Sequence, residues 1–172
     1  KWASAKDVIL YILQQLSVKG GVNKIIEYTG EGLKELSLTD RATICNMGAE
    51  LGATTSVFPT DEITKEYLIQ QGREEDYVEL KADEDATYDE EITVDLSKLV
   101  PLTAKPHSPD AVVPVSELRG MKINQVVIGS CTNSSLPDML KAAKILKGRR
   151  VATHVSLVIA PGSSSILAML SK

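Results

Sequence analysis

One cysteine in the last third of the chain lies where a strand is expected to give way to a helix. The apolar residues 126–128 predict a strand, Gly129 and Ser130 a tight turn, and the polar run 132–135 the start of a helix, with Cys131 between them. Open α/β sheets bind ligands at the carboxyl ends of their strands, and the positive end of a helix dipole favours the thiolate that metals require. The alternative is a small apolar side chain under a turn. Cys131 is therefore a candidate metal ligand.

A second group of polar residues lies on a predicted helix over residues 41–51. Asn46 and Glu50 are four positions apart, so in a regular α-helix they share one face. An amide and a carboxylate on one face can bind or orient a polar ligand, and the alternative is an ordinary solvated helix surface.

Both stretches resemble motifs of the aconitase family of iron–sulfur hydro-lyases. Residues 128–135 (IGSCTNSS) are similar to the first cluster-ligand motif, and residues 42–59 (ATICNMGAELGATTSVFP) are similar to a segment that lies upstream of it in the family. Shorter agreements occur at residues 61–62, 67–68, 106–110 and 161–163. The resemblance covers nearly the whole chain. It implies an α/β fold, layered α/β/α with a parallel or mixed sheet, in two small lobes.

The resemblance also implies roles for individual residues. Members of the family hold a [4Fe–4S] cluster with three cysteines, and Cys131 matches one of them. Asn46 and Glu50 match positions that approach the cluster and its bound water. Cys45 lies in the wrong motif to be a ligand, so we expect a buried structural thiol. Ser130, Thr132 and Asn133 are expected to cap the following helix, and the alternative is that they donate hydrogen bonds to the cluster or the substrate.

Several parts of the family's site are not found in this sequence. The other two cluster cysteines, the general base and the substrate-binding residues have no match, and the start at Lys1 reads as a cut inside a longer protein. We therefore expect a fragment of a parent enzyme, inactive and without a bound cluster when isolated, whose partners are the remaining domains of the same chain.

The expected parent activity is that of an aconitate hydratase, which isomerises citrate and isocitrate via cis-aconitate in the tricarboxylic acid cycle. The GAELGATTS stretch favours this tricarboxylate substrate over isopropylmalate. The alternatives are a homoaconitase or 3-isopropylmalate isomerase fragment, or a non-catalytic scaffold. A thiol enzyme with Cys131 as nucleophile would need a base, for which His154 is the candidate; otherwise His107 and His154 are expected to be structural.

Composition excludes other classes of function. The net charge is −4 and the isoelectric point about 5.3, which argues against a nucleic-acid surface. The chain has no apolar run of the roughly 20 residues that a membrane helix needs. Two differently placed cysteines do not form a disulfide framework, so we expect a cytoplasmic protein.

The remaining pattern predicts the elements that position these residues. We expect a second lobe over residues 1–100, a proline-rich connector over 101–114, and the first part of a third lobe over 115–172. The acidic segment 73–95 is expected to be a solvated surface rather than a divalent-cation site, because it lacks calcium-loop spacing. The predicted helices are 4–16, 41–51, 60–72, 136–146 and one after Ser163; the predicted strands are 22–29, 57–58, 92–96, 123–128 and 155–160.

Overall fold

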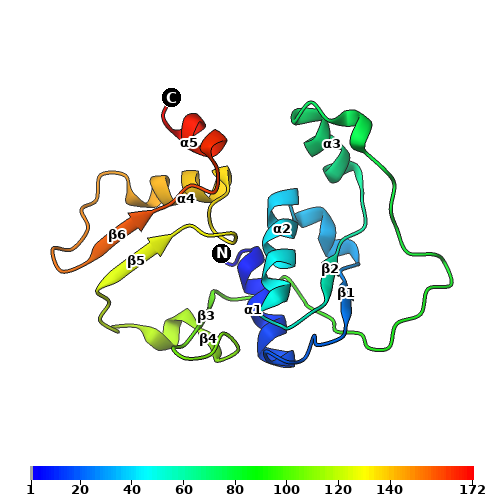
Figure 1. The fold of residues 1–172 in the computed structure, drawn as a ribbon. Helices are drawn as coiled ribbons and strands as arrows, with labels where there is room; N and C mark the ends of the chain where they lie inside the picture. Colours follow the sequence, from blue (N-terminus) through cyan, green and yellow to red (C-terminus); the bar gives the residue numbers. More distant parts are fainter. Residues whose placement is uncertain (1) are drawn as a thin grey trace. The chain divides into compact units, whose positions relative to one another are not determined.

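The fold was obtained as a computed structural model, and the structure describes residues 2–172. The chain forms two compact units, one ending at Val115 and the other spanning residues 116–172. Figure 1 shows a mixed α/β protein, as the sequence predicts. Its strands form three separate two-stranded sheets, two parallel and one antiparallel.

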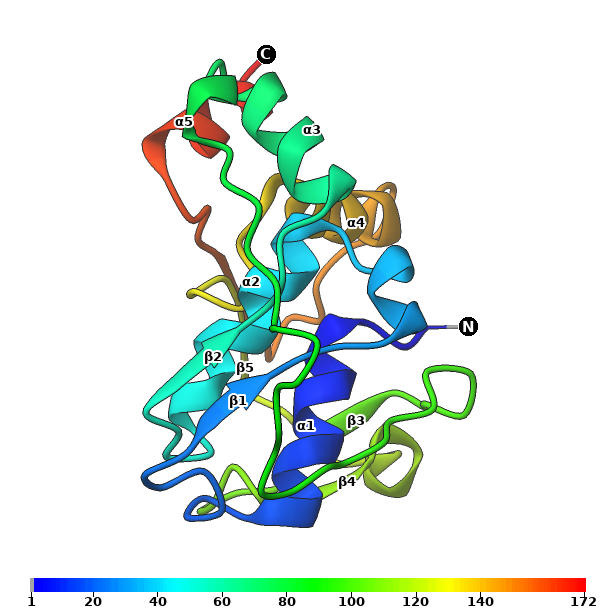
Figure 2. The same ribbon diagram turned by 90° about the vertical axis from the view of Figure 1, so that its right-hand side faces the viewer.

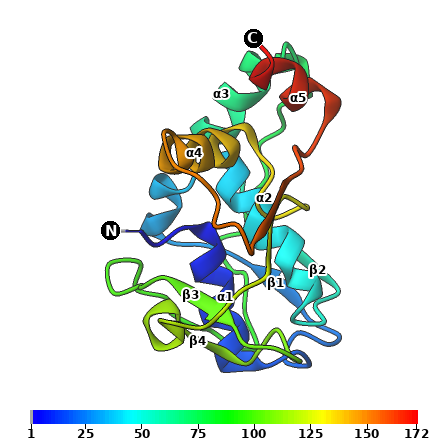
Figure 3. The ribbon, with the colours of Figure 1, turned by 90° about the vertical axis from the view of Figure 1, so that its left-hand side faces the viewer.

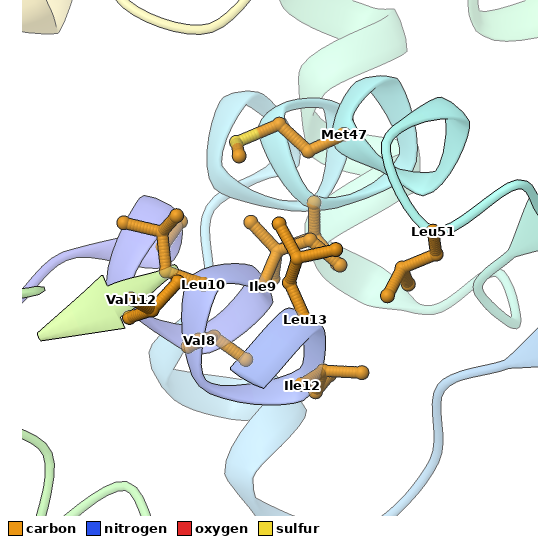
Figure 4. Close-up of a cluster of buried hydrophobic side chains, with 10 residues drawn as sticks. Val8, Ile9, Leu10, Ile12, Leu13, Met47, Leu51 and Val112 are labelled. Atoms are coloured by element: carbon orange, nitrogen blue, oxygen red, sulfur yellow. The ribbon is translucent and has the colours of Figure 1, made fainter. Parts of the chain in front are cut away.

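The first helix, α1 (Ala5–Leu16), supplies much of the core of the first unit. Asp7 closes its amino end by accepting hydrogen bonds from the backbone N–H (2.6 Å) and the hydroxyl (3.0 Å) of Ser4. The apolar residues of this helix recur at helical spacing and so lie on one face. Ile9 and Leu13 on this face are fully buried and belong to the same hydrophobic cluster as Leu51 (Figure 4). The predicted helix over 4–16 is confirmed.

A parallel pair of short strands lies beside this core. Strand β1 (Ile25–Glu27) runs alongside β2 (Thr55–Val57), with Ile25 opposite Thr55 (Figure 2). Between them the chain forms the 3-10 helix η1 (Glu31–Glu35), the helix α2 (Leu38–Asn46) and the 3-10 turn η2 (Met47–Ala49). The helix α3 (Glu62–Gln70) and the 3-10 turn η3 (Glu74–Asp76) follow.

The helices α2 and α3 begin at other residues than the predicted ranges 41–51 and 60–72. Ser37 caps α2 and forms a capping box with Asp40, which is therefore inside the helix. Asp61 caps α3 by accepting from the N–H of Thr64 (3.1 Å). The hydroxyl of Thr60, where the predicted helix starts, instead binds the backbone of Val78 and Leu80. In both helices the preceding loop decides where the helix starts, and so which side chain can reach the free N–H groups of the first turn.

The acidic segment contains no strand at residues 92–96, where alternation predicted one. Val94 and Leu96 pack against the core, which explains why apolar and polar residues alternate in this segment. No neighbouring strand forms a hydrogen-bonded ladder with it among the described residues. Among the described residues, no group of three or more His, Cys, Asp or Glu side chains is placed to hold a metal ion.

Residues 101–114 form a hairpin of β3 (Leu102–Ala104) and β4 (Val112–Pro114). The hairpin packs on α1 (Figure 3), where Asp7 accepts from the N–H of Leu102 (2.6 Å) and Gln14 donates to the carbonyl of Val112 (2.9 Å). A two-stranded hairpin has only edge strands, which tolerate proline.

The second unit is built from two strand–turn–helix segments. After the 3-10 turn η4 (Val115–Leu118), β5 (Gln125–Ile128) leads to α4 (Leu136–Leu146), and β6 (Ser156–Ile159) leads to α5 (Ser164–Leu170). The strands β5 and β6 are parallel, with Gln125 opposite Ser156 and Ile128 opposite Ile159. The strands predicted over 123–128 and 155–160 and the helices that follow them are confirmed. No helix among residues 2–172 is long and apolar enough to cross a membrane.

Candidate functional site

Cys131 is carried by the turn that links β5 to α4. It follows the strand after Gly129 and Ser130 and is exposed to solvent. The helix begins at Leu136 with Ser135 as its cap, so the predicted capping by Ser130, Thr132 or Asn133 is wrong. The chain uses residues 130–134 to turn, which moves the first free N–H groups of α4 beyond their reach.

The residue before the cysteine has an unusual backbone conformation. Ser130 has φ = 68°, in the left-handed region that non-glycine residues seldom occupy. Its hydroxyl lies 3.8 Å from the sulfur of Cys131. Such conformations persist where the surrounding structure enforces them, often at functional sites. The exposed thiol of Cys131 therefore follows a residue, Ser130, whose backbone conformation a serine does not favour.

Asn46 and Glu50 lie in the first unit, and the regular α-helix does not extend across both of them. The helix α2 ends at Asn46, and the 3-10 turn Met47–Ala49 follows. A 3-10 turn rotates the chain by about 120° per residue instead of about 100°, so the two side chains do not share one face as predicted. Asn46 is exposed, whereas Glu50 is half-buried and its Oε2 is buried without a hydrogen-bond partner among the described residues.

A recess of about 380 Å³ adjoins Asn46. Its lining consists mainly of small residues: Cys45, Asn46, Gly48, Ala49, Ala53, Thr54, Thr55 and Ser56. Gly48 approaches Ser56 so closely that a Cβ there would lie 2.3 Å from the Ser56 hydroxyl. This close contact joins the η2 turn to β2 and brings hydroxyl groups next to Asn46.

Cys45 lies in the same recess, half-buried. Its thiol donates to the carbonyl of Ser56 (3.5 Å), and burial raises its pKa. A buried thiol with a raised pKa is a poor metal ligand and a poor nucleophile at neutral pH. Its environment is that of a structural thiol.

Sequence reasoning missed a buried arginine on α2. Arg41 is 2% exposed and binds both carboxylate oxygens of Asp61, at 2.9 and 2.6 Å, as well as the carbonyl of Leu33 at 3.0 Å. The guanidinium also lies 5.9 Å from the centre of the Phe58 ring, which stacks on Tyr28. The signal was its spacing: Arg41 lies three positions before the fully buried Ile44.

His154 does not complete a catalytic arrangement with Cys131 within the second unit. Cys131 follows the carboxyl end of β5, whereas His154 precedes the amino end of the parallel strand β6. The length of a four-residue strand, about 13 Å at roughly 3.3 Å per residue, separates these two edges. The thiol-nucleophile alternative with His154 as base is therefore wrong. His107 lies in the loop between β3 and β4, in the first unit.

Comparison with known proteins identifies the family. The model for the Aconitase family (aconitate hydratase) matches residues 1–120 and 116–172. The chain belongs to the aconitase family. It is 46% identical to the 3-isopropylmalate dehydratase large subunit 2 of Archaeoglobus fulgidus over 166 residues, which is 96% of this chain and 40% of the relative. The corresponding large subunit of Clostridium kluyveri is 46% identical over 165 residues, 96% of this chain and 39% of the relative.

The names of the relatives bear on the expected substrate. Both relatives, and the 44% identical one from Rubrobacter xylanophilus, are named for 3-isopropylmalate. They favour the isopropylmalate alternative over citrate and give no support to a role in the tricarboxylic acid cycle. Their names as dehydratases agree with the predicted hydro-lyase class. The chain spans about 40% of the length of the curated relatives that it matches.

Aconitase-family proteins generally carry a [4Fe–4S] cluster, and one residue of this chain fits such a group. Thiolates are the usual ligands of these clusters. Cys131 offers an exposed sulfur, whereas the Cys45 thiol is half-buried and donates to a carbonyl. Cys131 therefore fits a single ligand position of the cluster.

Proposed function

We propose that this chain is part of an aconitase-family hydro-lyase that acts on 3-isopropylmalate or a closely related hydroxy acid. The observation that carries the proposal is the 46% identity over 96% of the chain to a 3-isopropylmalate dehydratase large subunit. The dehydration removes a hydroxyl group from one carbon and a proton from the next. The family's cluster supplies a Lewis acid for the departing hydroxyl when it is bound.

Cys131 is proposed as one thiolate ligand of that cluster. The support is its matching motif and its exposed position on the turn after β5. The other two thiolates would come from parts of the parent protein outside this sequence. Residues 1–100 and 115–172 would then belong to the second and third lobes of the family, joined through residues 101–114.

Glu50 and Asn46 are proposed to serve the reacting groups in different ways. The Oε2 of Glu50 is buried and has no partner among the described residues, so it can accept a hydrogen bond from a water molecule or a substrate hydroxyl. Asn46 is exposed and carries an amide that can donate to a thiolate or to a substrate carboxylate. Neither role requires the shared helix face that the sequence predicted.

The name of the relatives suggests a partner. A large subunit works together with another polypeptide, so we propose a companion subunit in addition to the other domains of the parent chain.

The experiment compares three forms of the complete parent protein: the wild type, Cys131→Ser and Cys45→Ser. Each is reconstituted anaerobically with iron and sulfide, desalted, and analysed for iron per chain and for activity on 3-isopropylmalate and on citrate. We expect Cys131→Ser to lose the cluster and activity, and Cys45→Ser to keep both. Full iron retention by Cys131→Ser would refute the ligand assignment. Activity on citrate alone would refute the substrate.

A further inference from the structure

The turn that carries Cys131 is fixed at both of its ends by one neighbouring segment. Gly129 at the start of the turn is buried, and Ser134 at its end is 8% exposed, although Ser130 and Cys131 between them are exposed. Both ends contact residues 160–162, which follow β6. Because β5 and β6 are parallel, these two connections meet at the same edge of the sheet.

The first contact is between Gly129 and Ala160. The N–H of Ala160 donates to the carbonyl of Ile128 (2.9 Å) and extends the ladder of β5 and β6 by one bond. A Cβ at position 129 would lie 2.8 Å from the carbonyl oxygen and 2.9 Å from the Cβ of Ala160. Only glycine allows the backbones to approach this closely before the chain enters the left-handed conformation at Ser130.

The second contact is between Ser134 and Gly162. The N–H of Gly162 donates to the carbonyl of Ser134 (3.1 Å). A Cβ at position 162 would lie 2.4 Å from the Ser134 hydroxyl, 3.1 Å from its Cβ and 3.2 Å from its carbonyl oxygen. Ser134 therefore packs directly on the backbone of Gly162. Residues 130–133 span the interval between these two fixed points.

We propose that residues 160–162 form a platform that fixes the Cys131 turn, with Gly162 and Ser134 as positioning residues for the Cys131 sulfur. The inference rests on the proposed function in so far as Cys131 is a cluster ligand. A cluster held by three thiolates needs each sulfur in a defined place, and a ligand on an exposed turn keeps its place only if the turn is held at both ends. The platform also accounts for the unfavourable conformation of Ser130, because fixed ends leave the turn few other shapes.

The first test measures the turn in the full 172-residue chain without any cluster. Three variants are compared with the wild type by amide hydrogen exchange: Gly162→Ala, Ser134→Ala, and the double variant. The methyl group in Gly162→Ala collides with the Ser134 hydroxyl, so exchange in the peptides covering residues 129–135 and 160–163 should be about tenfold faster. Ser134→Ala keeps the backbone contact and should exchange within about threefold of the wild type.

The double variant is the matched control, because it removes the hydroxyl that causes the collision. Its remaining contacts at 3.1 and 3.2 Å require only a small adjustment, so its exchange should return to within about threefold of the wild type. Unchanged exchange in Gly162→Ala, or a double variant that exchanges as fast as Gly162→Ala, would overturn the platform. Peptides from the first unit provide an internal reference.

The second test measures the cluster in the complete parent protein. Gly162→Ala should retain less iron after desalting than the wild type and, after reduction with dithionite, show a changed electron paramagnetic resonance spectrum. The double variant should recover both. Normal iron and spectrum in Gly162→Ala, with Cys131→Ser losing its iron, would refute the platform and leave the ligand assignment intact. Full iron in Cys131→Ser would instead refute the assignment of Cys131 as a cluster ligand.

Discussion

The buried ion pair between Arg41 and Asp61 allows an asymmetric prediction for the stability of the first unit. The Arg41 side chain is 2% exposed and the Asp61 side chain 35% exposed. Asp61→Asn preserves the shape of the side chain and its ability to cap α3, because asparagine caps helices as well as aspartate does. It removes the negative charge and one of the two acceptor oxygens, so the buried guanidinium keeps the carbonyl of Leu33 and a neutral amide oxygen as its acceptors in this site.

The expected magnitudes follow from which partner can return to water. Breaking a buried ion pair costs about 3–5 kcal/mol when the remaining charge stays buried. We expect Asp61→Asn to lower the free energy of unfolding by about 3 kcal/mol, at the low end of this range because Asp61 is partly exposed. In Arg41→Met the carboxylate can rehydrate and methionine fills the volume, so the loss should be about 1–2 kcal/mol.

The assay is urea unfolding followed by far-ultraviolet circular dichroism on both single variants and the double variant. If the buried charge dominates, the double variant should be about as stable as Arg41→Met and more stable than Asp61→Asn. Equal losses in the two single variants, or losses that simply add in the double variant, would refute the reasoning.

Three further predictions concern ionisation and thiol chemistry. The Arg41 guanidinium holds the pKa of Asp61 below its usual value. The stability that this pair contributes is therefore complete above about pH 4 and is lost as the pH falls through the lowered pKa. Acid unfolding of Asp61→Asn should lack this pH-dependent loss of stability. Burial raises the pKa of Tyr28 to about 12. The contribution of the neutral Tyr28 side chain to folding stability is therefore complete below about pH 10 and is lost as the pH rises through about 12. Ultraviolet titrations of the wild type and of Tyr28→Phe should differ by one late-ionising tyrosine. Iodoacetamide followed by peptide mapping should label Cys131 at least about tenfold faster than Cys45, whose thiol is half-buried with a raised pKa, and equal rates would contradict the assigned environments.

The sequence predicted the second unit more accurately than the first. In the second unit the signals are local: the apolar run before Gly129 and the helical spacing from Leu136 to Leu146 give the observed β5 and α4 within a few residues. In the first unit the predicted strand over residues 22–29 shrinks to Ile25–Glu27, because only three residues find a partner in β2. Strand length is set by pairing, which a single segment does not encode.

For the candidate site, the sequence identified the residues but not their geometry. The motif around Cys131 and the segment containing Asn46 and Glu50 led to the aconitase family, which the family match shows. The 3-10 turn that separates the faces of Asn46 and Glu50 was not predicted. The close contact of Gly48 with Ser56, and the Gly52 that turns the chain back towards β2 with φ = 73°, lie at this break in the helix. Such contacts between elements override local helix preference.

The sequence by itself determined the family, the mixed α/β class and the identity of the cysteine that matches a cluster ligand, because motifs and apolar spacing are written along the chain. Only the tertiary structure decided which charges are buried and which backbone is strained. In the sequence, Arg41 has the pattern of an ordinary exposed cation on a helix. In the structure it is buried beside Asp61 and Phe58, which come later in the chain. Likewise Gly162 reads as a turn glycine until the parallel pairing of β5 and β6 brings it against Ser134. These properties depend on packing between segments distant in sequence, which local patterns do not specify.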